Sequence, residues 1–253
     1  MTDAWSLDGR VALVIGAGRG IGRGCALELA KAGAAVVAVA RSGDEIDETV
    51  SLIEAEGGTA VSHVADVTSE KGVESAVKAA EDLGDLRVCM NGAGTNVVGP
   101  ARSYKVEDWD LLMEVNVRAT FLGCRAAGDS MLTRKVRGSI INMSSQMGAV
   151  GFPGRAAYCA SKHAVDGLSQ ALGVEWAPDG IRVNSVAPTF VLTPLTAPMF
   201  DDPEFKAEVM RRIPAGEVAT IEQVSHAVRY LACDASGSVT GSVLRVDGGW
   251  TAW

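Results

Sequence analysis

The sequence contains no apolar run long enough for a membrane helix, and its first ten residues lack the basic and apolar regions of a signal peptide. We therefore expect a cytoplasmic protein with no membrane partner. The sequence also has few positively charged residues: it contains 23 lysines and arginines and 31 aspartates and glutamates, which gives a net charge of −8. This sign argues against a protein that binds nucleic acid, because the nucleic-acid backbone is itself negatively charged.

Cysteine and histidine are too few and too scattered for a disulfide framework or a protein-held metal. The five cysteines form no Cys-x-x-Cys pair, and the three histidines stand far apart in the chain. Separate cysteines in odd number are typical of reduced thiols in the cytosol. A metal site would need a helical histidine pair or a Cys/His cluster. The sequence therefore predicts no bound metal.

The chain is rich in hydrophobic residues, at 47%, which is enough for a large core, and it contains 29 glycines in 253 residues. Short apolar runs alternate with helix-length segments, as in parallel sheets that are buried on both faces. This pattern predicts an α/β fold, a seven-stranded, doubly wound Rossmann-type sheet with helices on both faces. The expected strands are 11–15, 35–40, 60–64, 86–90, 139–143, 181–186 and 242–246, and the expected helices are about 20–32, 44–56, 69–83, 107–131, 156–176 and 221–233.

No segment resembles an interdomain linker, so we expect residues 1–253 to form one domain. The proline-rich segment at about 189–214 is too long for an ordinary turn between a strand and a helix. We expect it to cover the substrate and to contain a short helix, although a mobile surface insertion is the alternative. Its apolar residues favour the first interpretation: Phe190, Leu192, Leu195, Met199, Phe200 and Phe205.

A glycine-rich turn follows the first expected strand. Gly16, Gly20 and Gly22 have the spacing G-x-x-x-G-x-G, which differs from the common G-x-G-x-x-G. A strand, a glycine turn and a helix N-terminus together place backbone N–H groups and a positive helix end where a pyrophosphate can bind. A tight turn that binds no ligand is the alternative, and the position after the first strand favours the phosphate site.

The end of the second expected strand indicates which dinucleotide is bound. An acidic residue there would bond the ribose 2′-hydroxyl of NAD, but the strand ends in Ala40 and Arg41, with no acid before Asp44. The guanidinium of Arg41, helped by Arg19 in the glycine turn, suits a 2′-phosphate. We therefore expect NADP(H) to be favoured over NAD(H), unless both arginines are ordinary solvated charges.

Tyr158 and Lys162 are four residues apart on an expected helix, so their side chains share one face. A nearby positive charge favours the phenolate and brings the tyrosine pKa closer to neutrality. Ser145 follows the fifth expected strand, at the edge where open α/β sheets bind ligands. A hydrolase with Ser145 as its nucleophile is a poorer interpretation, because the sequence has no G-x-S-x-G motif.

With these motifs, the chain resembles the short-chain dehydrogenase/reductase family over essentially its whole length. The shared motifs are Gly16/Gly20/Gly22, Asp66-Val67, Asn91-Gly92-Ala93-Gly94, Asn116, Ser145, Tyr158 with Lys162, Pro188 to Thr193, and Val246 to Gly249. The sequence departs from the family pattern at three positions near the cofactor: Ile15 replaces a threonine, Gly92 an asparagine and Thr189 a glycine.

The resemblance implies a role for each matching residue. Tyr158 is expected to be the acid/base, Lys162 to modulate its pKa and bind the nicotinamide ribose, and Ser145 to orient the substrate carbonyl. Asn116 is expected to hold a relay water, Asp66 to contact adenine, Asn91 the adjacent ribose, and Thr193 the nicotinamide carboxamide. The full set expected at the cofactor is Gly16, Arg19, Gly20, Ile21, Gly22, Arg41, Asp66, Val67, Asn91, Gly92, Ala93, Tyr158, Lys162, Pro188, Val191 and Thr193.

The expected reaction is hydride transfer that interconverts a secondary alcohol and a ketone. The residues expected at the substrate are Ser145, Gln146, Phe152, Tyr158 and Phe190. The sequence is similar to family members that act on sugar acids and polyols, such as gluconate 5-dehydrogenases, so the expected substrate is a small molecule of that kind.

The sequence also allows two other functions, and the family resemblance implies an oligomer. A 3-oxoacyl-[acyl-carrier-protein] reductase would need a basic patch for its acidic carrier, which Arg134, Lys135 and Arg137 could supply. A regulatory protein that binds the dinucleotide without turnover belongs to another class, and the intact set of Asn116, Ser145, Tyr158 and Lys162 argues against it. The family resemblance also implies a homotetramer, formed through the helices near 107–131 and 156–176 and the segment 246–253.

Overall fold

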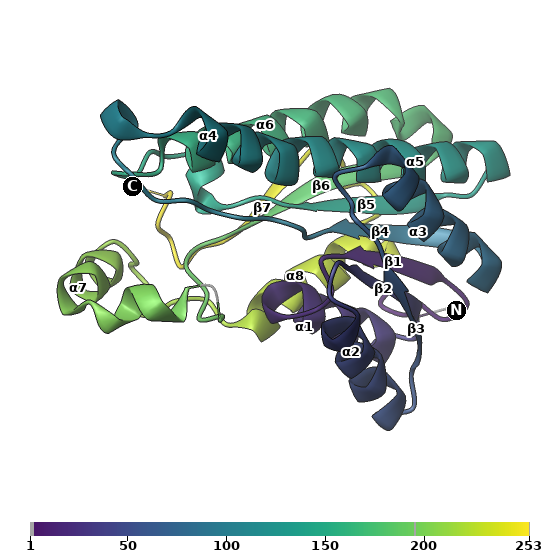
Figure 1. Cartoon of the computed structure of the whole chain (residues 1–253). Coiled ribbons are helices and arrows are strands. Elements are labelled where there is room, and N and C mark those ends of the chain that lie inside the picture. Colours follow the sequence, from purple (N-terminus) through teal and green to yellow (C-terminus); the bar gives the residue numbers. More distant parts are fainter. Residues whose placement is uncertain (1–2, 195, 253) are drawn as a thin grey trace.

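The computed structural model describes residues 3–194 and 196–252, and these build a three-layer α/β structure around one parallel sheet (Figure 1). The strand order is β3-β2-β1-β4-β5-β6-β7, and every neighbouring pair is parallel. The predicted seven-stranded, doubly wound sheet is therefore confirmed. The strands are β1 (Val11–Ile15), β2 (Ala35–Ala40), β3 (Thr59–Val64), β4 (Leu86–Asn91), β5 (Gly138–Met143), β6 (Ile181–Pro188) and β7 (Val243–Val246).

Two groups of helices cover the sheet, one on each face (Figure 1). Helices α1, α2 and α8 bury one apolar layer, and α3, α5 and α6 bury the other. The central strands β1 and β2 are buried on both faces, which explains their nearly continuous runs of valine, isoleucine and alanine, whereas the edge strand β3 is largely exposed. The helices are α1 (Gly20–Lys31), α2 (Gly43–Ala55), α3 (Glu70–Leu83), α4 (Val106–Leu112), α5 (Ala119–Arg134), α6 (Ala156–Glu175), α7 (Pro203–Arg211) and α8 (Ile221–Ala232).

The helix predicted over 107–131 differs from the structure. It consists of α4 and α5 joined by a π-helical turn, Met113–Arg118, and it continues to Arg134. Such turns insert one extra residue and re-aim the side chains that follow. Here the turn contains the fully buried Asn116. The helix ends at Lys135, which takes a left-handed backbone with φ of 54°, so no glycine marked this end in the sequence.

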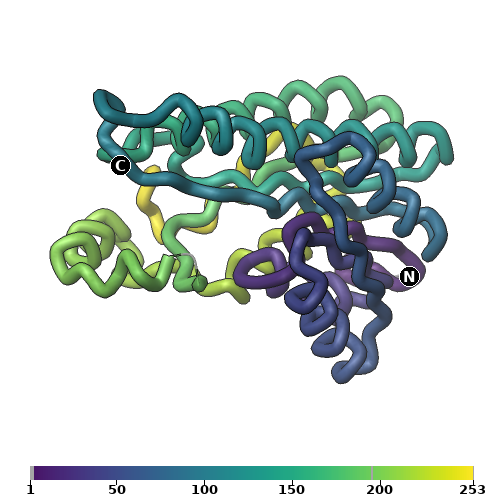
Figure 2. The backbone as a smooth tube through the Cα atoms, viewed as in Figure 1, coloured from purple at the N-terminus to yellow at the C-terminus, as the bar shows by residue number. Residues whose placement is uncertain are grey.

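The segment 189–214 forms a lobe beyond the carboxyl ends of β6 and β7, drawn in green in Figure 2. It contains the expected short helix, α7, whose N-terminus is capped by the Asp202 carboxylate. An aromatic cluster fixes the lobe to the rest of the chain, with Phe190, Phe200 and Phe205 packed against Phe152 and Trp250. Leu195, another apolar residue of this segment, lies outside the described residues.

Candidate active site

The carboxyl ends of β1, β4, β5 and β6 bring most of the predicted site residues to one edge of the sheet. Strand order reverses there, because β1 pairs with β2 on one side and with β4 on the other. Open α/β sheets bind ligands at such a switch point. The glycine turn follows β1, Asn91 ends β4, Ser145 follows β5, and Pro188 ends β6.

The glycine turn is shaped by close backbone contacts. A Cβ on Gly16, whose φ is 84°, would lie 2.7 Å from the Ala93 nitrogen, and one on Gly22 would lie 1.9 Å from the Gly16 oxygen. Gly20 has φ of 56°, and its side facing Thr193 is open to 3.6 Å. These three positions therefore require glycine for different reasons, and Thr193 lies next to Gly20.

Helix α1 begins directly behind this turn with its first N–H groups available. Its N-cap residue, Arg19, makes no side-chain cap hydrogen bond. An uncapped helix of twelve residues presents donors and a positive dipole end to an anion. The cradle therefore fits the pyrophosphate of a nicotinamide dinucleotide.

At the end of β2 the charges are mixed. Arg41 is exposed, and within residues 3–194 and 196–252 no carboxylate lies at ion-pair distance from it. Arg19 does pair with a carboxylate, that of Glu45, at 3.4 Å. Asp66 has a pKa held below its ordinary value, chiefly by hydrogen bonds from the Thr68 N–H and hydroxyl, with a smaller contribution from the charge of Arg41. Arg41 and Asp66 therefore lie close enough for the charge of Arg41 to act on the Asp66 carboxylate.

The Asn91 side chain is buried in the core of the sheet. It is 3% exposed, and Nδ2 donates to Asn142 Oδ1 at 2.8 Å inside the core. The resemblance implied that Asn91 contacts the adenine-side ribose, and only its backbone groups are free for that contact. Gly92 continues this turn, with its N–H bonded to the Ile15 carbonyl at 2.8 Å.

Asn116 is placed by the π-helical turn between two segments. Its Nδ2 donates to the Thr95 carbonyl at 3.0 Å and to the Ser161 hydroxyl at 3.0 Å, and its Oδ1 accepts from the Thr95 N–H at 2.8 Å. The side chain therefore ties the segment after β4 to α6, and both of its polar atoms have protein partners. Its backbone carbonyl accepts from the Thr120 hydroxyl at 2.8 Å.

Tyr158 and Ser145 are both withdrawn from solvent. Burial raises the pKa of the Tyr158 phenol above its ordinary value, and the Ser145 hydroxyl and the Arg155 charge lower it in part. The direction differs from the one expected from the helix spacing, in which a positive charge brought the pKa down. The reason is that desolvation of the phenol outweighs its neighbours.

Lys162 is 4% exposed, and its Nζ donates to the Met143 carbonyl at 2.8 Å. The same Nζ lies 5.6 Å from the centre of the Tyr158 ring, so the predicted pair does come together. Burial lowers the pKa of Lys162 to about 8, against the smaller opposing charge of Asp166. Burial of this ammonium therefore destabilises the folded protein, and its pKa lies close to neutral pH.

The predicted substrate residues fall into a polar group and an apolar group. Gln146 is 1% exposed, and neither Nε2 nor Oε1 has a partner within the described part of the chain. Phe190 is 8% exposed and its ring packs among those of the aromatic cluster, while Phe152 lies at the edge of that cluster with Tyr158.

Four residues of the expected cofactor set lie in packed positions. Val191 forms a bridge with Ala219 at the base of the lobe, and Pro188, at the end of β6, is buried. Ile21 and Val67 are at least partly buried and pack in the two sheet layers.

Arg155 is the residue at this edge that sequence reasoning missed. It precedes α6, is 3% exposed, and its charge acts on Tyr158. The one available signal was its position three residues before Tyr158, directly before the expected helix. The sequence could not reveal that the guanidinium is buried.

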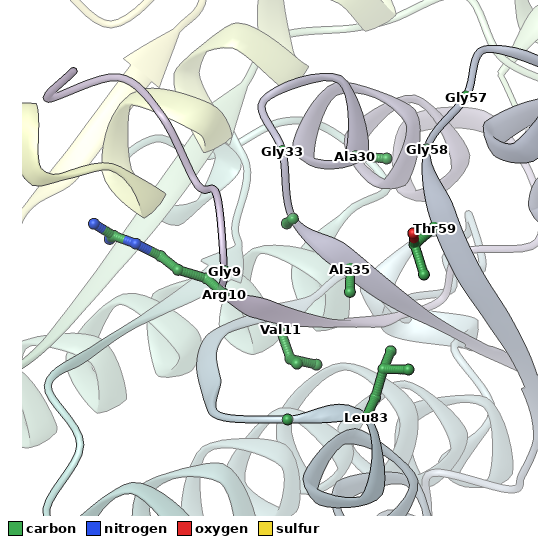
Figure 3. A pocket seen from close by; sticks show the side chains of 12 residues that line it. Gly9, Arg10, Val11, Ala30, Gly33, Ala35, Gly57, Gly58, Thr59 and Leu83 are labelled. Atoms are coloured by element: carbon green, nitrogen blue, oxygen red, sulfur yellow. The ribbon is translucent and has the colours of Figure 1, made fainter. Parts of the chain in front are cut away.

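A separate hollow of about 300 Å³ lies at the opposite edge of the sheet (Figure 3). Glycines and short side chains from the turns before β1, β2, β3 and β4 line it. Its one charged residue is Arg10, which extends away from the hollow and pairs with Asp234. Nothing in this hollow offers the chemistry of a ligand site.

In the part of the chain that the structure describes, no three histidine, cysteine, aspartate or glutamate side chains gather where they could hold a metal ion. None of the helices in residues 3–194 and 196–252 combines the length and the apolar character of a membrane span.

Comparisons with known proteins agree over nearly the whole chain. A protein-family model described as "Enoyl-(Acyl carrier protein) reductase" matches residues 16–251. The chain is 40% identical to 3beta-hydroxysteroid dehydrogenase 1 of Eggerthella lenta, over 98% of the chain and 95% of the relative. It is 38% identical to gluconate 5-dehydrogenase of Gluconobacter oxydans, over 98% and 97%.

A solved structure gives the same result for the fold. A gluconate 5-dehydrogenase from Burkholderia cenocepacia, crystallised with NADP and tartrate, superposes with a TM-score of 0.95 at 35% identity, over 99% of this chain and 98% of that one. The sheet order, the glycine cradle and these matches lead to one assignment. The chain belongs to the short-chain dehydrogenase/reductase family, as an oxidoreductase that uses a nicotinamide dinucleotide to interconvert a secondary alcohol and a ketone.

Proposed function

We propose that Tyr158 is the acid/base of this oxidoreductase and that Ser145 orients the reacting oxygen. The observation that carries this proposal is that the Ser145 hydroxyl, on a residue 8% exposed, hydrogen-bonds the desolvated phenol of Tyr158 and lowers its pKa. A bound nicotinamide dinucleotide supplies or accepts the hydride. Tyr158 gives its phenolic proton to the carbonyl oxygen in reduction and takes it from the hydroxyl in oxidation, while Ser145 hydrogen-bonds that oxygen.

Lys162 and Asn116 support this proton transfer without touching the reacting carbon. The Lys162 ammonium, 5.6 Å from the Tyr158 ring centre, favours the phenolate that forms when Tyr158 releases its proton. The same ammonium is proposed to bind the nicotinamide ribose. The relay water expected at Asn116 stays a prediction. The Asn116 side chain is already bonded to Thr95 and Ser161, and we propose that these bonds keep the segment after β4 in place.

The charges around the second strand favour NADP(H) over NAD(H). Arg41, directly after β2, and Arg19, in the glycine turn after β1, supply two exposed guanidinium groups, and no carboxylate among the described residues pairs with Arg41. A 2′-phosphate carries the charge that such groups bind. The structural relative from Burkholderia cenocepacia contains NADP. Glu45, paired with Arg19 at 3.4 Å, opposes this preference in part.

We propose a hydroxylated small molecule, a sugar acid or polyol, as the substrate. The amide of Gln146, buried directly after Ser145 and unpartnered within the described residues, gains hydrogen bonds from a ligand rich in hydroxyl groups. Phe152 supplies an apolar wall beside Tyr158. Two relatives are gluconate 5-dehydrogenases, which supports a sugar acid.

The carrier-protein alternative is disfavoured by the position of its basic patch. Arg134 and Lys135 end α5, and Arg134 pairs with Asp85, which precedes β4. The patch therefore lies at the amino edge of the sheet, away from Tyr158. A dinucleotide-binding regulatory protein remains the alternative of another class.

We further propose a homotetramer of single-domain subunits in the cytoplasm. Large apolar side chains stay exposed on the α4–α5 and α6 side, among them Trp109, Phe121 and Val174, at 39%, 42% and 77%. Such exposure is typical of a surface that another subunit covers. Trp253, the last residue of the expected C-terminal contact, lies outside the described residues. Light scattering coupled to size exclusion tests the assembly, and a monomer would contradict it.

Turnover tests the proposed function directly. Binding of NADPH and NADH is measured by nicotinamide fluorescence, followed by turnover with the preferred cofactor on sugar acids, polyols and 3-oxoacyl thioesters. We expect tighter binding of NADPH and turnover on a sugar acid or polyol that is lost in Tyr158→Phe. Binding without turnover on the whole panel would support the regulatory alternative, and turnover on thioesters alone would support the carrier-protein reductase.

A further inference from the structure

Arg155 holds a buried guanidinium whose hydrogen-bonding capacity is largely unused. The residue is 3% exposed, and its only side-chain bond among the described residues is from Nη2 to the Met199 sulfur, at 3.3 Å. Nε and Nη1 are buried and have no partner in residues 3–194 and 196–252. A thioether is a weak acceptor, so the guanidinium is poorly satisfied.

The surroundings of Arg155 contain no compensating negative charge. The groups that act on it are the phenols of Tyr104 and Tyr158 and the thiol of Cys159, and no described carboxylate lies at ion-pair distance. Burial consequently lowers the pKa of Arg155 below its ordinary value. A buried charge without a counterion destabilises a fold unless something satisfies it. An anionic ligand group would satisfy it.

The position of Arg155 brings it to the reacting residues. It stands at the N-cap of α6, three residues before Tyr158, and its charge counteracts the raised pKa of that phenol. Its contact with Met199 comes from the 189–214 segment, which is proposed to cover the substrate. Arg155 is therefore enclosed between the acid/base residue and the covering segment.

We propose that Arg155 binds a carboxylate of the substrate and thereby selects keto acids and hydroxy acids over neutral ketoses and polyols. This inference rests on the proposed function and narrows its substrate class to sugar acids. The guanidinium would use Nε and Nη1, the atoms left unpaired, as donors to the carboxylate oxygens. Gln146 would serve the hydroxyl groups.

A structural role is the alternative, in which Arg155 only joins α6 to Met199. A structural residue would affect every substrate alike, whereas a carboxylate-binding residue discriminates between them. Two reactions are therefore compared: reduction of 5-ketogluconate and reduction of a ketohexose in which a hydroxymethyl group replaces the carboxylate.

The test uses Arg155→Gln, Arg155→Lys and, as a matched control, Arg134→Gln. Arg134 is also an arginine, and it pairs with Asp85 at the opposite edge of the sheet. In Arg155→Gln we expect kcat/KM for the keto acid to fall roughly 10- to 100-fold more than kcat/KM for the ketose, through KM. Arg155→Lys keeps the charge and should recover part of the loss, and Arg134→Gln should not discriminate.

Gluconate binding gives a readout that does not depend on turnover. With NADP(H) present, gluconate should raise the melting temperature of the wild-type protein and of Arg134→Gln, but not that of Arg155→Gln. Equal losses on both substrates with an unchanged gluconate shift would overturn the inference while leaving the oxidoreductase intact. Failure of the proposed function is distinguishable, because the wild-type protein would then turn over neither compound.

Discussion

The side chain of Asn116 bonds both backbone groups of Thr95, accepting from its N–H at 2.8 Å and donating to its carbonyl at 3.0 Å. The π-helical turn that carries Asn116 buries it completely, so these bonds are made away from water. An amide is the side chain that can satisfy a backbone donor and a backbone acceptor at once. The pair therefore fixes the segment after β4 against α6.

Asn116→Ala should leave the Thr95 backbone without these partners. Unpaired buried groups destabilise a protein, so we expect the free energy of unfolding to fall by about 2 kcal/mol. Because Ala93, two residues before Thr95, contacts the glycine turn, the dissociation constant of NADP(H) should also rise several-fold. Urea unfolding and nicotinamide fluorescence measure the two effects. A stability loss with unchanged cofactor binding would separate Asn116 from the cofactor site.

Tyr158→Phe should remove turnover and keep binding. The phenol is buried beside Ser145, and removal of its hydroxyl deletes the proposed proton donor without opening a cavity. We expect kcat to fall roughly 10²- to 10⁴-fold, with the cofactor dissociation constant changed less than about twofold. Tyr230→Phe, on α8 and stacked near Trp5, is the matched control. Comparable activity in both variants would refute the proposed role of Tyr158.

Most of the fold could be predicted from the sequence because the central strands are nearly continuous buried apolar runs and several helix ends carry a glycine signal. Gly33, Gly57 and Gly84 mark the ends of the first three helices, and all three have positive φ. The π-helical turn had no comparable signal. It depends on where the Asn116 side chain finds partners, and Thr95 is distant from it in the sequence.

The sequence predicted the proximity of Tyr158 and Lys162 but not the electrostatics around them. The spacing of Tyr158 and Lys162 predicted their shared helix face, and the structure brings them together. It could not predict that burial would raise the pKa of Tyr158 and lower that of Lys162, because desolvation depends on the helices and the lobe packed around them. The buried, unpaired state of Arg155 was hidden for the same reason.

Substitutions of Arg41 and Glu45 should change the preference for NADPH over NADH in opposite directions. Arg41→Ala removes a guanidinium proposed to bind the 2′-phosphate, so the dissociation constant of NADPH should rise by about tenfold or more and that of NADH should change little. Glu45→Gln frees Arg19 from its 3.4 Å pair and removes a negative charge, so NADPH should bind more tightly. Fluorescence titrations of both cofactors measure the ratio. A parallel change for NADPH and NADH would show that neither residue reads the 2′ position.

The pH dependence of stability should report the buried ammonium of Lys162. Its pKa is about 8 in the folded protein and 10.5 when unperturbed. Below pH 8 both the folded and the unfolded state hold the proton, and the folded state bears the full penalty of the buried charge. Between pH 8 and 10.5 the folded state has released the proton while the unfolded state retains it, so stability rises with pH in this window. The difference between the two pKa values corresponds to about 3 kcal/mol in the free energy of unfolding.

Lys162→Met lacks this titration and should therefore be more stable than the wild-type protein near pH 7, although turnover is lost. The gain should be smaller than about 3 kcal/mol, because the variant also loses the bond to the Met143 carbonyl. Urea unfolding of both proteins at pH 7 and pH 9.5 measures it. The advantage of the variant should shrink by about 2 kcal/mol between these pH values, since the wild-type protein sheds its buried charge. Parallel stability profiles would mean that Lys162 keeps its proton throughout, and that the ammonium is stabilised by more than the charge of Asp166 and the Met143 carbonyl.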